Sequence, residues 1–293
     1  MRVERAFGTD GIRGRAGEGW LTDAGAAQVG FAVGSVLGQA GGGQVPRVLL
    51  GHDGRRSGRR LEMALAGGLA QAGLEATSTG LITTPGLAWL TRHGEFVLGV
   101  MVSASHNPAD DNGIKVFTRD GEKPAEALEL EIESLLAQGR QAAPPRAPQT
   151  DVALENAYLE HLLDQAGRGL SLNGLTMVLD CANGGGSRVA PRVFGRLGIA
   201  VHTLAAEPDG ENINRDCGST HPQDLQSEVR RRGARLGIAL DGDGDRCILV
   251  DERGEIVHGD GILTILARHA AERGEWRDRR IVATVMSNRG LHR

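Results

Sequence analysis

The segment Asp241-Gly-Asp-Gly-Asp-Arg246 alternates three carboxylates with two glycines and ends on an arginine. The apolar runs on either side, residues 235–240 and 247–251, predict two strands joined by this tight loop. Carboxylates that converge in a partly dry site repel one another unless a cation lies between them. Oxygen ligands favour a hard ion, Mg²⁺ before Zn²⁺. The segment therefore predicts a metal site formed by Asp241, Asp243 and Asp245.

Two other interpretations of this acidic segment remain open. Runs of Asp and Gly are common in solvated turns, although three aspartates in five residues are dense for a simple turn. In an EF-hand calcium loop, positions one, three, five and twelve would be Asp241, Asp243, Asp245 and Glu252. The sixth position of that loop is glycine, and here it is Arg246. The run after Arg246 also predicts a strand, where an EF-hand would begin a helix.

A second polar segment, Ser103-Ala-Ser-His-Asn-Pro108, follows an apolar run that predicts a strand ending at Val102. A serine at a strand end, beside histidine and asparagine, can act as a nucleophile or carry a phosphate. The Gly-x-Ser-x-Gly elbow of serine hydrolases is absent, and an ordinary turn before proline is the alternative. Residues 110–115 predict a turn into a further strand, which would bring Lys115 back beside Ser105.

The basic residues are unevenly divided between arginine and lysine. Of the 33 basic residues, only Lys115 and Lys123 are lysines. Arginine stays charged under almost all conditions, whereas lysine can release a proton. A lysine kept at a site in such a chain suggests a need for a titratable amine, and Lys115 is the candidate. Lys123 lies in a polar loop and is interpreted as a lysine without a special role, since a few lysines remain even in a chain that strongly favours arginine.

Four further polar segments carry no mechanism by themselves. Residues 7–14 are rich in glycine and include Arg13, but they match neither a Walker loop nor a dinucleotide-binding fingerprint. Residues 53–58 predict an arginine-rich surface turn that caps the next helix. Residues 83–86 and 217–222 predict polar turns.

Composition excludes several classes of protein. The 293 residues allow about two domains, and 40% hydrophobic with 24% charged residues is ordinary for a globular chain. A net charge of -4 argues against a broad nucleic-acid-binding surface. No apolar run reaches the roughly 18 residues of a membrane helix, and the first residues lack a signal peptide's apolar segment. Three cysteines without close pairs argue against a disulfide framework or zinc knuckle, so the cytoplasm is the expected compartment.

Short apolar strands alternate with amphipathic segments along the chain, the pattern of layered α/β domains. A first domain is expected over residues 1–140 and contains the serine segment. A proline-rich stretch predicts a linker at residues 141–153. A second domain, which contains the acidic segment, is expected at residues 154–253.

Residues 254–293 predict the start of a third domain, with a helix at residues 261–273 and a strand at residues 281–285. One helix and one strand are too little for an independent core. We therefore expect this third domain to be incomplete, as if the sequence ended within it at Arg293.

The first predicted helix, residues 21–37, has a regular spacing of small residues. Glycine recurs every four residues, at Gly30, Gly34 and Gly38. Glycines at this spacing lie on one face of a helix and allow another element to approach closely. The spacing predicts tight packing of this helix against a neighbour.

Together, these segments resemble the α-D-phosphohexomutase superfamily and, within it, the bacterial phosphoglucosamine mutases. The order is that of the family: an N-terminal arginine segment, a Ser-His-Asn-Pro loop and an Asp-Gly-Asp-Gly-Asp-Arg loop. The segments most similar to phosphoglucosamine mutases are Phe7-Gly-Thr-Asp-Gly-Ile-Arg-Gly14, Asn212-Ile-Asn-Arg-Asp-Cys-Gly-Ser-Thr-His-Pro222 and Val285-Met-Ser-Asn288. The resemblance implies an α/β protein with successive three-layer α/β/α domains, each with a mixed sheet.

The resemblance also implies roles for particular residues. Ser105 would carry the phosphoryl group as phosphoserine. One Mg²⁺ would be bound by Ser105, Asp241, Asp243 and Asp245. Phosphate contact, charge stabilisation and proton transfer would fall to Arg246, Lys115, His106 and Arg13.

The implied enzyme is an isomerase that interconverts glucosamine 6-phosphate and glucosamine 1-phosphate through a bound glucosamine 1,6-bisphosphate, on the route to UDP-N-acetylglucosamine. A phosphomannomutase or phosphoglucomutase is an alternative, because the Gly-Glu-x-Ser-Gly-His sugar-reading loop of complete members is absent. A non-catalytic magnesium- or phosphate-binding module is another. The Arg-x-Ser-Gly-Thr phosphate loop is also absent, so we expect the 293-residue chain to be poorly active. The expected partner is a small hexosamine phosphate, without nucleic acid or membrane, and a homodimer is compatible with the resemblance.

Overall fold

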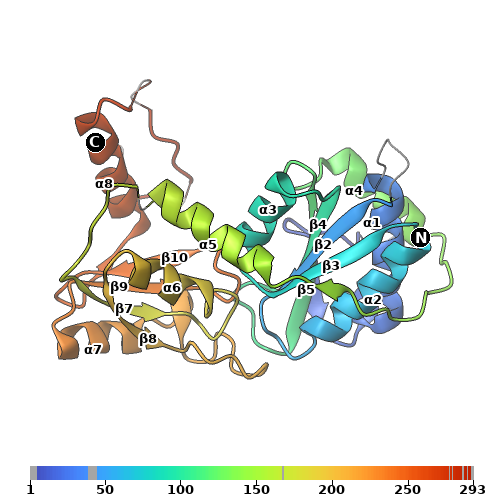
Figure 1. Ribbon diagram of the computed structural model, residues 1–293, viewed down its shortest axis with the longest axis horizontal. Helices are drawn as coiled ribbons and strands as arrows, with labels where there is room; N and C mark the ends of the chain where they lie inside the picture. Colours follow the sequence, from blue (N-terminus) through green and yellow to red (C-terminus); the bar gives the residue numbers. More distant parts are fainter. Residues whose placement is uncertain are drawn as a thin grey trace.

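The computed structural model describes residues 5–38, 45–166, 168–276, 278, 280–285, 287–288 and 290–291. Two sheets, each with helices on both faces, make up most of this part of the chain, and helix α8 stands apart from both (Figure 1). The predicted α/β class with three-layer units is confirmed. No helix in the described ranges is long and apolar enough to cross a lipid bilayer.

Among the described residues, the first sheet is mixed and has six strands. In spatial order they are β1 (Ile12–Arg15), β5 (Asp111–Thr118), β4 (Leu98–Val102), β2 (Arg47–His52), β3 (Glu75–Leu81) and β6 (Gln149–Thr150). Strands β4, β2, β3 and β6 are parallel, whereas β5 is antiparallel to both β4 and β1. The pairing of β4 with β5 places Lys115 opposite Met101.

Helices cover both faces of the first sheet. One face carries α1 (Asp23–Leu37), α2 (Gly58–Gln71) and α4 (Glu126–Leu136), and the other carries α3 (Thr84–His93) and α5 (Ala153–Ala166). Alternate residues of β2 divide between the two faces, as the period of a strand requires. Val48 and Leu50 pack in the core under α1 and α2, and Leu49 packs in the core under α3 and α5.

Helix α1 packs closely against α2, as the glycine spacing predicted. The helix begins at Asp23, because Thr22 caps it with a side-chain oxygen that accepts a hydrogen bond from the first turn. A Cβ atom added at Gly30 would lie 2.3 Å from the backbone oxygen of Leu65 in α2. Any side chain at this position would force the two helices apart.

The second sheet of the described chain has five strands. In spatial order they are β11 (Ile256–Val257), β10 (Cys247–Val250), β9 (Leu236–Leu240), β7 (Thr176–Asp180) and β8 (Ala200–Leu204). Helix α6 (Val189–Arg196) covers one face and α7 (Gln223–Arg232) covers the other. Leu179 packs with Phe194 of α6, and Val178 packs with Leu225 of α7. Short 3₁₀ turns lie at Gly19–Leu21 and Gly218–Thr220.

The two sheets share core and backbone contacts. Tyr158 of α5 and Val193 of α6 belong to the same buried cluster as Leu49 of the first sheet. The backbones also touch without intervening side chains: a Cβ atom at Gly185 would lie 2.2 Å from the backbone oxygen of Ile82. The two units therefore meet through a continuous, closely packed interface.

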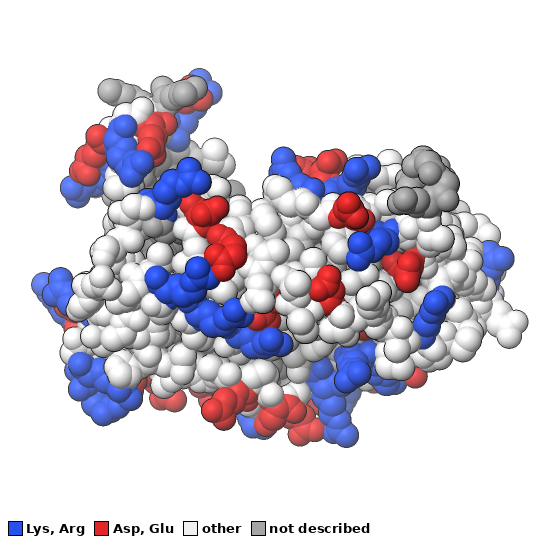
Figure 2. All heavy atoms as spheres, viewed as in Figure 1, with Lys and Arg blue, Asp and Glu red and all other residues white. Residues whose placement is uncertain are grey.

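Ion pairs reinforce this contact at the surface. Arg192 of α6 pairs with Glu155 of α5 at 2.6 Å, and Arg196 pairs with Glu160. Figure 2 shows positive and negative side chains interspersed over this face of the molecule, without a large area of one sign. The surface charge is therefore locally balanced on this side.

The stretch predicted as a linker, residues 141–153, packs on the first unit, against helix α2 and strand β3. Arg146 N donates to Met63 O at 2.9 Å, and Asp151 N donates to Ser78 O at 2.9 Å. Its strand β6 pairs with β3. The segment therefore adds an edge strand to the first sheet before the chain enters α5.

One prediction for the last part of the chain is wrong. The helix expected at residues 261–273 is present as α8 (Gly259–Glu272), but residues 281–285 form no strand. Val282 and Val285 are almost fully exposed, and none of the α8 side chains is buried. No strand of the described chain lies beside residues 281–285, so this apolar run has no backbone partner with which to form a sheet.

Candidate functional site

Two loops that are far apart in the sequence meet where the two sheets join. The serine loop (residues 103–110) connects β4 to β5, and the metal loop (residues 241–246) connects β9 to β10. Ser105 Oγ donates to Asp241 Oδ2 at 2.8 Å, across 136 positions of the chain. Ser105 is only 1% exposed. The structure thus brings the predicted serine and the predicted acidic segment into direct contact.

The three aspartates of the metal loop fit a cation. Each offers one oxygen atom, and these atoms lie within 4.8 Å of one another. Asp243 Oδ1 is buried and has no hydrogen-bond partner among the described residues. Burial, followed by the charge of Asp243, raises the pKa of Asp241 to about 6. A divalent ion would reduce the repulsion between the three carboxylates and would give Asp243 Oδ1 a partner. A donor set made of oxygen atoms alone suits a hard ion.

Both alternatives for the acidic segment are wrong. Asp241 and Asp243 are buried, which excludes a solvated turn. The loop runs directly into strand β10, where an EF-hand would begin a helix.

Lys115 lies against the metal loop. Its Nζ donates to Asp243 Oδ2 at 2.6 Å and to Asp245 Oδ2 at 3.5 Å. Burial by itself would raise the pKa of Asp243, but the charge and hydrogen bond of Lys115, together with weaker contributions such as the Thr84 hydrogen bond, lower that pKa overall. Within the described chain, no hydrogen bond joins Lys115 to Ser105, so this lysine meets the aspartates and not the hydroxyl.

Arg246 connects the serine loop to the metal loop. Its Nη2 lies 2.6 Å from Ser105 Oγ, 2.9 Å from Asp241 Oδ2 and 2.6 Å from His106 Nδ1. Because a guanidinium can only donate, His106 Nδ1 accepts and the neutral ring carries its proton on Nε2. Burial, followed by the charges of Arg246 and Arg13, lowers the pKa of His106. The lowered pKa favours the neutral form of His106, whose Nε2–H group makes no hydrogen bond within the described residues.

Arg13 lies at the margin of this cluster. It belongs to β1, and its Nη2 pairs with Asp10 Oδ2 at 3.1 Å. It makes no hydrogen bond to Ser105 in the described part of the chain, although its charge acts on His106. Of the predicted residues, all of which lie in the described ranges, Arg13 is the one for which the structure shows no hydrogen bond or ion pair with the two loops.

Two predictions about the polar turns are wrong, and because of each one a residue near the site was missed in the sequence analysis. Residues 83–86 contribute Thr84, whose Oγ1 donates to Asp243 Oδ2 and whose amide donates to Asp243 O at 2.8 Å. The Thr83-Thr84-Pro85 sequence at the start of a helix could have indicated this, because helix starts gather at the carboxyl edge of a parallel sheet.

Residues 53–58 are not a surface turn. The Arg55 side chain is 0% exposed and donates to the backbone of the serine loop. Asp53 is equally buried and pairs with Arg55 Nε at 2.9 Å. Sequence composition gave no sign of this burial, because charged residues are rarely enclosed unless a fold supplies all their partners.

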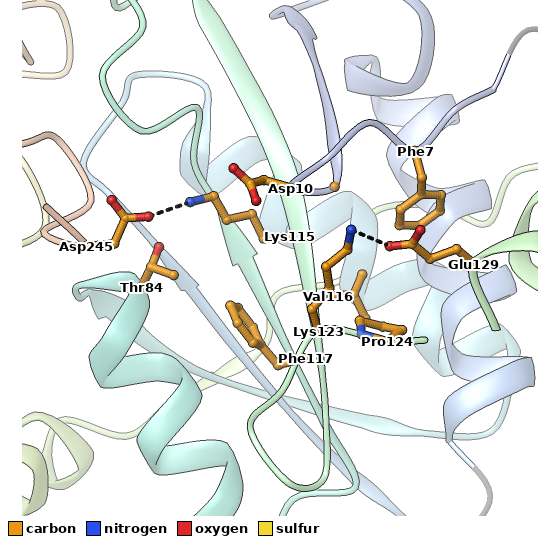
Figure 3. Close-up of a pocket in the computed structure, with 11 residues that line it drawn as sticks. Phe7, Asp10, Thr84, Lys115, Val116, Phe117, Lys123, Pro124, Glu129 and Asp245 are labelled. Carbon is orange, nitrogen blue, oxygen red and sulfur yellow. Dashed lines mark hydrogen bonds and ion pairs between the residues drawn. The ribbon is translucent and has the colours of Figure 1, made fainter. Parts of the chain in front are cut away.

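A pocket of about 170 Å³ adjoins the metal loop (Figure 3). Lys115 and Asp245 lie at one end, and the ion pair of Lys123 with Glu129 lies at the other. Phe117 forms part of the wall between them. The second lysine of the chain therefore faces the same pocket as the first.

Comparison with known proteins agrees with this arrangement. Residues 4–143 match the family described as phosphoglucomutase/phosphomannomutase, alpha/beta/alpha domain I, and residues 156–254 match its domain II. The chain is 47% identical over 295 residues to a phosphoglucosamine mutase of Moorella thermoacetica, covering 98% of this chain and 65% of that protein. It is 49% identical over 288 residues to one of Alkalilimnicola ehrlichii, covering 97% and 63%. The chain thus spans 63–65% of the length of these two relatives.

Solved structures share the fold. A phosphoglucomutase/phosphomannomutase family protein of Burkholderia thailandensis superposes with a TM-score of 0.80 at 27% identity, over 94% of this chain and 60% of that one. The N-acetylphosphoglucosamine mutase of Aspergillus fumigatus, solved with GlcNAc-6P and magnesium, superposes with a TM-score of 0.52 at 18% identity, over 93% and 56%. At that identity the second likeness concerns the fold alone. The two matched domains, with the serine and metal loops in contact, establish that this chain belongs to the phosphoglucomutase/phosphomannomutase family.

Proposed function

We propose that this protein is an isomerase that interconverts glucosamine 6-phosphate and glucosamine 1-phosphate, with Ser105 as the carrier of the phosphoryl group. The observation that carries the proposal is the contact of Ser105 Oγ with Asp241 and with Arg246, at 2.8 and 2.6 Å. A hydroxyl held between a cation site and a guanidinium is suited to carry phosphate. Relatives at 47–49% identity that are named phosphoglucosamine mutases support the choice of sugar.

Phosphoryl transfer depends mainly on positioning and on charge stabilisation. A bound Mg²⁺ would supply positive charge against the phosphoryl oxygens, and we assign its binding to Asp241, Asp243, Asp245 and the phosphoserine. Arg246 would donate hydrogen bonds to the phosphoserine oxygens, since its Nη2 already lies beside Ser105 Oγ. Together these positive charges reduce the repulsion between the three aspartates and a phosphoserine of roughly -1.5 to -2 charge.

We assign Lys115, His106 and Arg13 to the reaction of the incoming sugar hydroxyl and to the phosphoryl oxygens. As its oxygen forms a bond to phosphorus, the bond from phosphorus to Ser105 Oγ breaks and the hydroxyl proton must leave. We assign that transfer to the pair formed by Lys115 Nζ and Asp243 Oδ2, which lie 2.6 Å apart: as the Lys115 ammonium passes one of its protons to the carboxylate, the freed amine accepts the hydroxyl proton. The Nε2–H group of His106 is free to donate to a phosphoryl oxygen. Arg13, at the margin, is assigned to the outer phosphate contacts, and glucosamine 1,6-bisphosphate is the proposed intermediate.

Phosphorylation of Ser105 is the first test. The protein is incubated with Mg²⁺ and glucose 1,6-bisphosphate, and its intact mass is measured. We expect one added phosphate in the unaltered protein and in Ser187→Ala, a control at another buried serine, and none in Ser105→Ala. A phosphate that persists in Ser105→Ala would contradict the assignment of the carrier. Failure of the unaltered protein to take any phosphate would instead favour a non-catalytic binding module.

Turnover is the second test. Glucosamine 6-phosphate, mannose 6-phosphate and glucose 6-phosphate are compared as substrates of the complete gene product, and we expect the amino sugar to give the highest kcat/KM. A preference for either neutral sugar would move the assignment to a phosphomannomutase or phosphoglucomutase. The 293-residue chain is expected to be much slower, since it lacks the sugar-reading and distal phosphate-binding motifs. Rates equal to those of a full-length relative would refute that expectation.

A further inference from the structure

The guanidinium of Arg55 is saturated by the serine loop and its surroundings. Its Nε donates to Asp53 Oδ2 at 2.9 Å. Its two terminal nitrogens donate to four backbone carbonyls, those of Ser105 at 2.9 Å, Asn107 at 2.8 Å, Asp111 at 2.9 Å and Pro108. An arginine has five N–H donors, and here all five have acceptors within the protein. Arg55 therefore has no donor left for a ligand, and its role is to hold the backbone.

The serine loop needs such support because of its conformation. Ser105 has a φ of +54°, in the left-handed region that side-chain-bearing residues rarely adopt. Residues held in this region persist only where the surroundings determine them. In this conformation the carbonyl of Ser105 faces Arg55 while its hydroxyl faces Asp241 and Arg246. The position of the hydroxyl is thus coupled to the hydrogen bonds made by its own carbonyl.

The second unit completes the enclosure of this carbonyl. Asn214 Nδ2 donates to Ser105 O at 2.9 Å and to Asn107 O at 3.1 Å. Gly242 of the metal loop closes another side, since a Cβ atom there would lie 2.6 Å from Ser105 O. Asn214 is itself buried and left-handed, with a φ of +57°. The carbonyl of Ser105 is therefore fixed from both units at once.

We infer that Arg55 and Asn214 are positioning residues for phosphoryl transfer. They hold the serine loop by its carbonyls so that the Ser105 hydroxyl points at the metal loop, and they touch neither substrate nor metal. This inference rests on the proposed function, in which Ser105 is the phosphoryl carrier. Loss of either residue should slow transfer without weakening the binding of metal or sugar phosphate, because the residues that would bind those ligands remain in place.

The test compares Asn214→Ala with a matched control, Asn183→Ala. Asn183 is also a left-handed asparagine of the second unit, but every hydrogen bond that its side chain makes in the described part of the chain stays within that unit, to Asn212 O, Cys217 Sγ and the Glu207 amide. Phosphorylation of Ser105 by glucose 1,6-bisphosphate with Mg²⁺ is followed by quenched-flow and intact mass over a range of bisphosphate concentrations. Hydrogen exchange of peptides that cover residues 103–110 is measured in parallel, and Mg²⁺ binding is measured by calorimetry.

We expect Asn214→Ala to lower the maximal phosphorylation rate about 10- to 100-fold, the usual effect of misplacing a reacting group by about 1 Å. The bisphosphate concentration for half-maximal rate and the Mg²⁺ affinity should stay unchanged, and exchange of residues 103–110 should accelerate. Asn183→Ala should behave as the unaltered protein in all three measurements. Arg55→Lys keeps the charge but offers three donors in place of five, so it should slow phosphoryl transfer more than Asn214→Ala does. If Arg55→Lys does not fold, the result for Asn214→Ala decides whether the inference holds.

Two results would overturn the inference. One is an unchanged maximal rate in Asn214→Ala; the other is a loss confined to bisphosphate binding. If the unaltered protein takes no phosphate, the proposed function fails separately. The positioning role is then decided by hydrogen exchange alone: faster exchange of residues 103–110 in Asn214→Ala, and not in Asn183→Ala, supports it, and equal exchange refutes it.

Discussion

Glu62 should make the stability of this protein depend strongly on pH. This glutamate of α2 is 3% exposed, and its Oε1 accepts a hydrogen bond from Ser78 Oγ at 2.9 Å. Burial raises the pKa of Glu62 from 4.5 to about 8, against smaller lowering effects of Ser78 and Arg59. The folded protein thus holds a proton on Glu62 that the unfolded chain releases above about pH 4.5.

The sign and size of the effect follow from this difference. Stability that depends on the neutral carboxyl is fully present below the unfolded pKa and is lost as the pH rises towards the folded pKa of about 8. Each pH unit between the two values is worth about 1.4 kcal/mol, so the loss approaches about 5 kcal/mol by pH 8. The substitution Glu62→Gln keeps the size and the acceptor for Ser78 but cannot ionise. It should therefore escape the loss.

The assay is urea unfolding of the two proteins at about pH 5 and about pH 8. Near pH 5 the two free energies of unfolding should differ by about 1 kcal/mol or less, and near pH 8 the variant should be more stable by about 3–5 kcal/mol. Glu75→Gln, at an exposed glutamate on β3, is the matched control and should show no such change. An equal difference between Glu62→Gln and the unaltered protein at both pH values would refute the reasoning. Titration of the Glu62 carboxyl by NMR, with a midpoint near its ordinary value, would do the same.

Three further predictions concern the site and the packing beneath it. Asp243→Ala should abolish Mg²⁺ binding in calorimetry, because it removes a buried ligand and leaves the Lys115 ammonium without its closest partner; unchanged affinity would contradict the metal assignment. Lys115→Arg should lower the phosphorylation rate of the complete enzyme about 100-fold or more although the charge is kept, since guanidinium does not transfer protons readily, and a full rate would show that charge alone suffices. Gly30→Ala should destabilise the protein by about 2 kcal/mol or more in urea unfolding, because the new methyl group would overlap the backbone oxygen of Leu65; unchanged stability would show that α1 and α2 can separate freely.

The main residues of the candidate site could be predicted because they lie in short segments of the sequence. The Asp241 segment places its ligands within five residues, and Ser105 lies directly after a strand, so local pattern sufficed to nominate both. Their contact across 136 positions was expected from family resemblance, not from the residues themselves. Helices and strands with a clear period, such as α1 with its glycines, were predicted within a few residues of their observed ends.

The supporting residues could not be predicted because their role exists only in three dimensions. Arg55 can be buried because a loop about 50 residues later in the chain supplies acceptors for its guanidinium. The polar residues around Arg55 in the sequence predict an exposed turn and give no sign of these distant acceptors. Thr84 lies in a segment that was predicted only as a polar turn, and its bond to Asp243 depends on how the two sheets are joined. The strand expected at residues 281–285 failed for the opposite reason, since an apolar run forms a strand only when a partner lies beside it.

The glycine contacts between the two sheets have a consequence for motion. A Cβ atom at Gly185 would lie 2.2 Å from the backbone oxygen of Ile82, and one at Gly242 would lie 2.6 Å from the carbonyl oxygen of Ser105. Backbone that packs directly on backbone leaves no layer of side chains that could deform between the two units, so we expect the proposed phosphoserine site to move as one rigid body. For the sugar phosphate substrate proposed above, we expect any opening motion to take place after Val250, because no side chain of α8 is buried.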